Sequence, residues 1–384
     1  MIYLDSAATT RPSDNVAEFL SDSLTKYYAN PDSTHSEGME ASRQIEKARA
    51  IVAGVLKTKP EEIIFTSSGT EANNLAFFGV CDALKRRGNK IIVSDSEHPS
   101  VYMPVKELEK RGFEIIYLST KGGVINLEEL REALDERVIL ISVMLINNET
   151  GVIYDIQKIA ETVESVYKNA EHKPYIHTDG VQAFGKININ LNKLKVDMFS
   201  ASAHKIHGIK GAGFLYLRKG TKLTPQIFGG DQERGLRSST LNTPGIIAFG
   251  KAAEEINIQE NQQIIDNLYN YAVQKIREKC PGVKFNQEGA SISKYILSLR
   301  LPNVRSEIML NYLSSRGIYI SSGAACSSKK TGLQESTRVL LNYGLDKFTA
   351  DFTVRASFSK YNVFEEIDEF VNALADGIEK FAVY

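Results

Sequence analysis

Small, polar and ionisable residues follow five short apolar runs of this 384-residue sequence, and each run is typical of a buried strand. The pairs are "EIIFT" before "SSGTEANN", "KIIVSDS" before "EH", "VILISVMLI" before "NNETG", "YIHT" before "DGVQ", and "VDMFSA" before "SAHK". In open α/β sheets, ligands bind outside the carboxyl ends of the strands. We therefore expect these five strand ends to converge on a single active site.

Three of these segments indicate chemistries that belong together. "SSGTEAN" is a small-residue turn that opens a helix, where backbone N–H groups and hydroxyls can hold a phosphate. Lys205 stands beside His204 among small residues, and a desolvated lysine becomes a nucleophile that forms imines with aldehydes. Asp179 is a candidate partner for a buried cation. Each segment taken alone has an ordinary structural explanation, but phosphate, aldehyde and aromatic nitrogen together describe pyridoxal 5′-phosphate.

One of the three cysteines, Cys326, lies in the run "SSGAACSSKK", where no neighbour could pack it into a core. Free cysteine is usually buried, and an exposed thiol is open to reaction through its thiolate. Cys81 and Cys280 lie far away in sequence, so the three form neither a disulfide framework nor a CxxC pair. Cys326 is therefore a candidate nucleophile.

The composition excludes several classes of protein. Acidic and basic residues are interleaved with a net charge of −1, whereas a nucleic-acid site needs a concentrated basic face. The apolar runs are too short to span a membrane, and the start "MIYLDSAATT" does not resemble a signal peptide. We expect a cytoplasmic protein with neither nucleic acid nor membrane as a direct partner. A metal site is not expected, because the four candidate ligands match no standard zinc spacing: His177, Asp179, His204 and His207.

Short apolar strands alternate with amphipathic helices up to about residue 250, which predicts an α/β fold with a mostly parallel sheet between helices. The pattern then changes, and a smaller α/β domain is expected. We predict a large domain over 13–255 and a small domain made of 1–12 and 256–384, with the cysteine loop at about 321–335. Asn362 and Glu365 have the spacing of a capping box at the start of the last helix.

Motifs along nearly the whole chain resemble those of one family. They include "TSSGTEANNLA", "NNETGVI", "HTDGVQAFGK", "SASAHKIHGIKGAGFLY", "ERGLRSSTLNTPGI", "SSGAACSS" and "VRASFS". In order and spacing they resemble the cysteine desulfurases of the NifS/IscS type, within the class V aminotransferases. The resemblance implies fold type I of the pyridoxal-phosphate enzymes, with a seven-stranded, mostly parallel sheet in the large domain.

The resemblance also implies a set of residues that bind the cofactor. Lys205 would hold it covalently, Asp179 would pair with the pyridinium nitrogen, and Gln182 would hydrogen-bond the ring hydroxyl. His98 would stack on the ring and move protons as a catalytic residue beside Lys205. The residues implied for the phosphate are Gly69, Thr70, Ser202 and His204, with Thr240 supplied by the second subunit of a homodimer. Glycine at 69 departs from the more usual alanine.

For the substrate, the resemblance implies that Asn148 lies beside the cofactor and that Asn148 and Arg355 bind the carboxylate of L-cysteine. Guanidinium suits this task because it binds carboxylates in a bidentate way. Cys326 would take the sulfur as a persulfide and leave L-alanine. The sulfur would then pass to an acceptor protein, such as an iron–sulfur scaffold or a tRNA-thiolation enzyme.

Two other functions stay open from the sequence. The chain could be another class V pyridoxal-phosphate enzyme, such as an aminotransferase or a selenocysteine lyase, or mainly a scaffold for sulfur relay. An aminotransferase has no need of Cys326, and the "SSGxAC" form of its loop favours the NifS/IscS branch. The complete set of candidate catalytic residues argues against a scaffold that has lost its activity.

Overall fold

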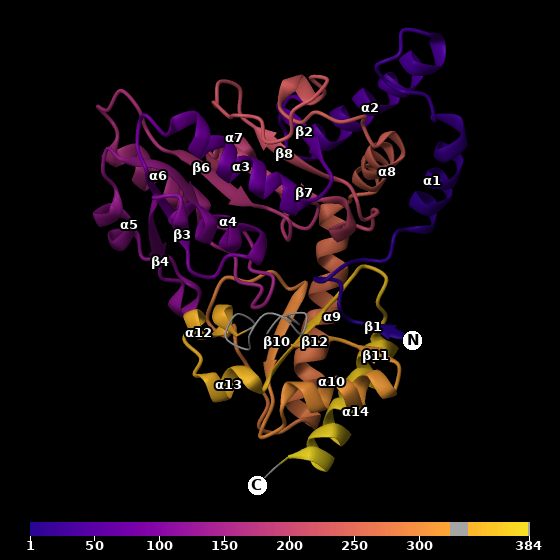
Figure 1. Cartoon of the computed structure of the whole chain (residues 1–384). Coiled ribbons are helices and arrows are strands. Elements are labelled where there is room, and N and C mark those ends of the chain that lie inside the picture. The colour runs from indigo at the N-terminus through magenta and orange to yellow at the C-terminus, as the bar shows by residue number, and fades with distance from the viewer. Residues whose placement is uncertain (323–336, 383–384) are drawn as a thin grey trace.

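The computed structural model describes residues 1–322 and 337–382, and its upper part in Figure 1 is built on a seven-stranded sheet. In spatial order the strands are β2 (Ile63–Thr66), β8 (Gly213–Leu217), β7 (Met198–Ser202), β6 (Tyr175–Asp179), β5 (Val138–Ser142), β3 (Lys90–Ser94) and β4 (Glu114–Leu118). Strand β8 runs antiparallel to both of its neighbours, and the other pairs are parallel. The predicted α/β class is confirmed.

Helices cover both faces of this sheet, which explains why its central strands are apolar throughout rather than alternating. The helices of this part are α1 (Asp14–Lys26), α2 (Ser36–Val55), α3 (Gly69–Leu84), α4 (Pro99–Lys110), α5 (Leu127–Ala133), α6 (Ile156–Val166), α7 (Leu191–Leu194) and α8 (Thr243–Glu254). Within β3, Ile91 and Val93 pack with the core of α3 and α4. Ile92 between them packs on the opposite face with the core of α2, α6 and α8.

A second core lies in the lower part of Figure 1. Its antiparallel sheet has the order β12 (Ser321–Ser322), β13 (Thr353–Ser357), β10 (Ile296–Arg300) and β9 (Lys284–Phe285). Its helices are α9 (Ile258–Lys279), α10 (Ser306–Ser315), α12 (Arg338–Tyr343), α13 (Lys347–Asp351) and α14 (Phe364–Phe381).

The N-terminal segment belongs to this second core. Strand β1 (Ile2–Tyr3) pairs in parallel with β11 (Ile318–Tyr319), and Leu4 and Ala7 are buried in the same cluster. From β1 the chain then runs up to α1 (Figure 1). These contacts agree with the expected role of the first dozen residues, while the division into domains at 13 and 256 stays a prediction.

Two local expectations were wrong. Helix α14 begins at Phe364, and Glu366, not Glu365, accepts hydrogen bonds from the Val363 N–H and the Asn362 side chain. The run "VILISVMLI" is a strand only as far as Ser142, although the N–H of Leu145 still donates to the carbonyl oxygen of Asp179, the last residue of β6. The segment "NNETG" follows at the carboxyl ends of the strands. In the described parts of the chain, no helix is both long and apolar enough to cross a bilayer.

Candidate active site

Lys205 follows β7 in a short 3-10 helix, Ala203–Lys205, and its ammonium points to the N-terminal segment. Its Nζ donates to the carbonyl oxygens of Ala7 and Ala8 at 2.6 and 2.7 Å. Burial, together with the positive charge of Arg355, lowers the pKa of Lys205 to about 8. The amine is therefore easier to deprotonate than an exposed lysine, as a nucleophilic lysine requires.

A chain of hydrogen bonds joins Asp179, at the end of β6, to His98. Asn73 of α3 donates through Nδ2 to Asp179 Oδ2 and to Ser100 Oγ, both at 2.8 Å. The Ser100 hydroxyl then lies 2.7 Å from His98 Nδ1, which also accepts from the Ser100 N–H at 3.1 Å. Asp179 Oδ1 accepts from the Val181 N–H. The carboxylate is thus held in one orientation at the sheet edge.

This chain also assigns the tautomer of His98. The Ser100 hydroxyl accepts from Asn73 and so donates to Nδ1, which leaves the ring proton on Nε2. His98 is the N-cap of α4, where Pro99 suits the first helical position. Surrounding protein atoms, with the charges of Lys205 and Arg338, lower the pKa of His98 despite the opposing effect of Asp179. The ring is therefore neutral at physiological pH.

The residues predicted for a phosphate lie at the start of α3 and the end of β7. Ser68 caps α3 by accepting from the Glu71 N–H, and Gly69 and Thr70 are the first helical residues. A Cβ added at Gly69 would lie 2.6 Å from Val181 Cγ2 and 3.7 Å from Ser202 Cβ. The departure from alanine at this position is thereby explained, since Val181 occupies the space.

His204, the remaining predicted phosphate residue of this group, lies partly buried next to Lys205. Its Nδ1 is 3.1 Å from Thr9 Oγ1. Burial and the neighbouring lysines, Lys205 first among them, lower the pKa of His204 to about 4. A neutral ring at this position can donate a hydrogen bond without adding a charge.

Arg355 enters the site from β13 of the second sheet. Its Nη1 donates to the carbonyl oxygen of Asn148 at 2.7 Å, and its Nη2 pairs with Asp5 Oδ1 at 2.9 Å. Among the described residues, Arg355 Nε and the side-chain oxygen Asn148 Oδ1 are buried without a hydrogen-bond partner. The two predicted carboxylate-binding residues are therefore adjacent, with unused polar atoms.

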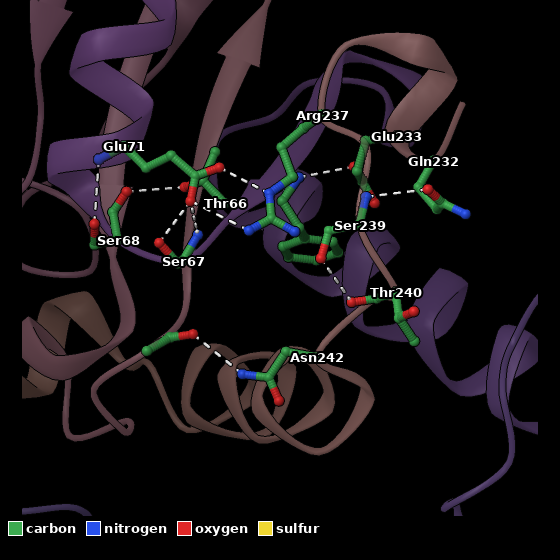
Figure 2. A network of polar contacts seen from close by, with 12 residues as sticks. Thr66, Ser67, Ser68, Glu71, Gln232, Glu233, Arg237, Ser239, Thr240 and Asn242 are labelled. Atoms are coloured by element: carbon green, nitrogen blue, oxygen red, sulfur yellow. Dashed lines mark hydrogen bonds and ion pairs between the residues drawn. The ribbon is translucent and has the colours of Figure 1, made fainter. Parts of the chain in front are cut away.

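Thr240 lies apart from these residues in the same chain. It is exposed on the segment after the 3-10 helix Glu233–Gly235, and its carbonyl oxygen accepts from the Ser239 hydroxyl. Figure 2 shows the Glu71 carboxylate between Ser67 and Arg237, which ties this segment to the start of α3. Cys326 lies outside the described residues.

The sequence analysis did not single out Asn73, Ser100, Asp5 or Lys186. Asn73 stands inside the quoted motif "TSSGTEANNLA", and Ser100 lies two residues after the quoted pair "EH", so both could have been found from their place beside strand ends. Lys186 donates to Gln182 Oε1 at 2.8 Å, and Gln182 Nε2 donates to the Ala7 carbonyl oxygen at 2.8 Å. His177 uses both ring nitrogens on the hydroxyls of Ser142 and Ser200, so it is not free to bind a metal.

The site fits pyridoxal 5′-phosphate. It offers a lysine of lowered pKa, an oriented carboxylate and a capped helix start. In the part of the chain that the structure describes, Asn73 Oδ1, Asn148 Oδ1 and Arg355 Nε are buried polar atoms without partners. Such atoms are costly unless a ligand or water meets them.

Comparison with known proteins places this geometry in a family. The profile of the family "Aminotransferase class-V" matches residues 2–370. The chain belongs to the class-V aminotransferases. This family, with its cysteine desulfurases, depends on pyridoxal 5′-phosphate.

Several proteins with related names are similar to this chain over almost their whole length. A protein of Dictyoglomus turgidum named "Cysteine desulfurase IscS" is 37% identical, covering 99% of this chain and 95% of its own. "Putative cysteine desulfurase IscS 1" of Bacillus subtilis is 34% identical, covering 99% of both chains. A solved structure titled "NifS-like protein" is 36% identical with a TM-score of 0.90, covering 99% of this chain and 100% of its own.

Proposed function

We propose that this protein is a pyridoxal-phosphate-dependent cysteine desulfurase, which converts L-cysteine to L-alanine and takes the sulfur on Cys326 as a persulfide. The observation that carries the proposal is the convergence of Lys205, Asp179, His98 and Arg355 at one sheet edge. Near full-length similarity to proteins named cysteine desulfurase supports the choice of reaction.

Lys205, Asp179 and Gln182 would hold the cofactor ring, and Gly69, Thr70, Ser202 and His204 its phosphate. When bound, the cofactor supplies an electron sink for bond cleavage next to the amino group of the substrate. Asp179 favours the charged ring nitrogen because its own carboxylate is fixed by Asn73 and by the Val181 N–H.

The chain's own residues account for binding and proton movement. Arg355 can offer its unpaired Nε to the substrate carboxylate, beside Asn148. The neutral ring of His98 carries its proton on Nε2, which can donate a hydrogen bond towards the bound substrate. It can take up a proton only at Nδ1, where it would displace the hydrogen bonds from Ser100.

The sulfur transfer balances without a further reactant. The Cys326 thiolate attacks the sulfur of bound cysteine, an S–S bond forms, and the C–S bond breaks with its electron pair on the carbon skeleton. Protonation of that carbon gives L-alanine, and Cys326 is left as a persulfide. A thiolate of an acceptor protein can then take the outer sulfur of this persulfide and release Cys326.

We also propose a cytoplasmic homodimer in which Thr240 completes the phosphate site of the partner. Thr240 is exposed, and the same segment carries exposed apolar side chains, with Phe228 at 80% and Ile227 at 39% exposure. Exposed aromatic side chains are frequent at protein interfaces. An iron–sulfur scaffold or a tRNA-thiolation enzyme would accept the sulfur.

The test is alanine production from L-cysteine under reducing, anaerobic conditions by the native protein, Cys326→Ala and Lys205→Ala. Production by the native protein that is lost in both variants is the expected result. Equal production by native protein and Cys326→Ala would contradict the sulfur-carrier role and favour a general lyase. Retained production by Lys205→Ala would contradict the cofactor assignment.

A further inference from the structure

Lys186 is a buried ammonium four residues beyond Gln182, with 6% of its surface exposed. Its Nζ donates to Gln182 Oε1 at 2.8 Å and lies 5.5 Å from the centre of the Tyr295 ring. Within the described parts of the chain, no carboxylate forms an ion pair with it. A buried charge without a counter-ion is costly and calls for an explanation.

The contacts of Lys186 fix the direction of the Gln182 amide. An ammonium group can only donate hydrogen bonds, so the amide oxygen must face Lys186. The amide nitrogen then faces the Ala7 carbonyl oxygen at 2.8 Å, and the same oxygen accepts from Lys205 Nζ at 2.6 Å. The donor side of Gln182 is thereby turned towards Lys205. The reversed amide would place its NH₂ group against the ammonium.

We propose that Lys186 is a positioning residue that holds Gln182 as a hydrogen-bond donor to the ring hydroxyl of the cofactor bound at Lys205. This inference rests on the proposed function, because it concerns the same cofactor. The hydrogen bond stabilises the anionic form of the ring oxygen and so weakens the proton affinity of the nitrogen through which Lys205 is joined to the cofactor.

The electrostatic surroundings support this role. Burial, followed by the charges of Lys205 and Arg355, lowers the pKa of Lys186 to about 7. A small cavity of ≈ 30 Å³ is lined by both Lys186 and Lys205. The other titratable groups that line it are His207, Glu255, Tyr295 and Lys360. Loss of the proton from Lys186 would let its amine accept as well as donate, and would release the constraint on Gln182.

The test uses the pH at which the visible absorbance band of the cofactor-loaded protein changes. Lys186→Met removes the donor but keeps an unbranched apolar side chain, and Lys186→Arg keeps a cation that can only donate. We expect Lys186→Met to raise the transition by about one pH unit, because a charge-assisted hydrogen bond is lost. Lys186→Arg should leave the transition near that of the native protein.

A double-mutant cycle with Gln182→Glu separates positioning from a direct effect of charge. Glutamate keeps an acceptor for Lys186 but cannot donate to the cofactor when ionised. If Lys186 acts through Gln182, Lys186→Met adds no further shift in the Gln182→Glu background. If Lys186→Met proves insoluble, Lys186→Gln is measured instead, with the same upward shift expected, because an amide can accept as well as donate and no longer fixes the direction of Gln182.

The inference is overturned if neutral substitution of Lys186 leaves the transition unchanged, or if Lys186→Arg shifts it as far as Lys186→Met. A purely structural role would have the second result, since arginine disturbs the packing at least as much. Absence of a Lys205-dependent band in the native protein would overturn the proposed function together with this inference. If the native protein shows the Lys205-dependent band but the neutral variants of Lys186 have the same transition pH, the inference alone is overturned.

Discussion

Replacement of Glu233 by glutamine should destabilise the protein strongly. Both partners of the Arg49–Glu233 pair are buried, with 5% and 0% of their side chains exposed. The contact is bidentate, at 2.7 and 2.8 Å, and Glu233 Oε2 also accepts from the Phe65 N–H at 2.8 Å. Burial alone would lower the pKa of Arg49, but the hydrogen bond and the charge of Glu233 raise it. Glutamine has nearly the same shape, but among the described residues it leaves Arg49 with a single carboxylate partner, the exposed Glu46 at 3.0 Å from Nε.

The expected magnitude follows from this burial. Removing one partner of a buried ion pair costs about 3 kcal/mol or more. For 384 residues, an unfolding entropy of about 2.1 cal/mol/K per residue amounts to roughly 0.8 kcal/mol/K. The midpoint of thermal unfolding should therefore fall by roughly 4 °C. Calorimetry of the cofactor-free protein measures this directly.

The matched control is Glu288→Gln, whose pair with Arg277 is 62% and 74% exposed at 3.5 Å. Exposed pairs contribute less than about 1 kcal/mol, so the midpoint should hardly change. The double variant Arg49→Met, Glu233→Met should be more stable than Arg49→Met alone, because no unpaired charge stays buried. Equal midpoints for Glu233→Gln and Glu288→Gln would refute this reasoning.

Two further predictions concern the site and the pH dependence of stability. Gly69→Ala should weaken cofactor binding and lower stability by about 1–2 kcal/mol, because the new Cβ would lie 2.6 Å from Val181 Cγ2. Val181→Ala in the same chain should restore both, as measured by cofactor titration and thermal unfolding; no restoration would contradict the steric explanation. Burial lowers the pKa of His177 from 6.5 to about 3, so the folded state favours the neutral ring and loses stability as pH falls below 6.5. His177→Gln should flatten the decline of the unfolding midpoint between pH 6.5 and 5 by comparison with the native protein, and an unchanged slope would contradict the assignment.

The strand ends and their polar residues were predictable because burial in a two-faced parallel sheet leaves a plain apolar signal. The convergence of Lys205, Asp179 and His98 follows from that topology. Side-chain contacts within the second core between distant parts of the chain were not predictable. The pairing of Arg355 with Asp5 joins residues 350 positions apart, and neither side chain stands in a pattern that indicates it.

Lys186 illustrates a different limit of sequence patterns. In "GVQAFGK" it follows a glycine and reads as a solvated lysine at a turn. Gly185 at φ +74° reverses the chain there, and Lys186 is directed back to Gln182. The direction of the Lys186 side chain thus depends on the positive φ of Gly185. Glycine permits this angle but does not require it, so the sequence does not reveal it.

The active site also depends on contact between the two cores. Lys205 comes from the large sheet, Arg355 from the second sheet, and Ala7 and Ala8 from the N-terminal segment that packs with the second core. Burial is the first cause of the lowered pKa of Lys205, and the charge of Arg355 is the second. Separation of the cores would expose the amine and remove both effects. A nucleophilic amine therefore arises only after the cores have docked, which couples cofactor chemistry to completion of the fold.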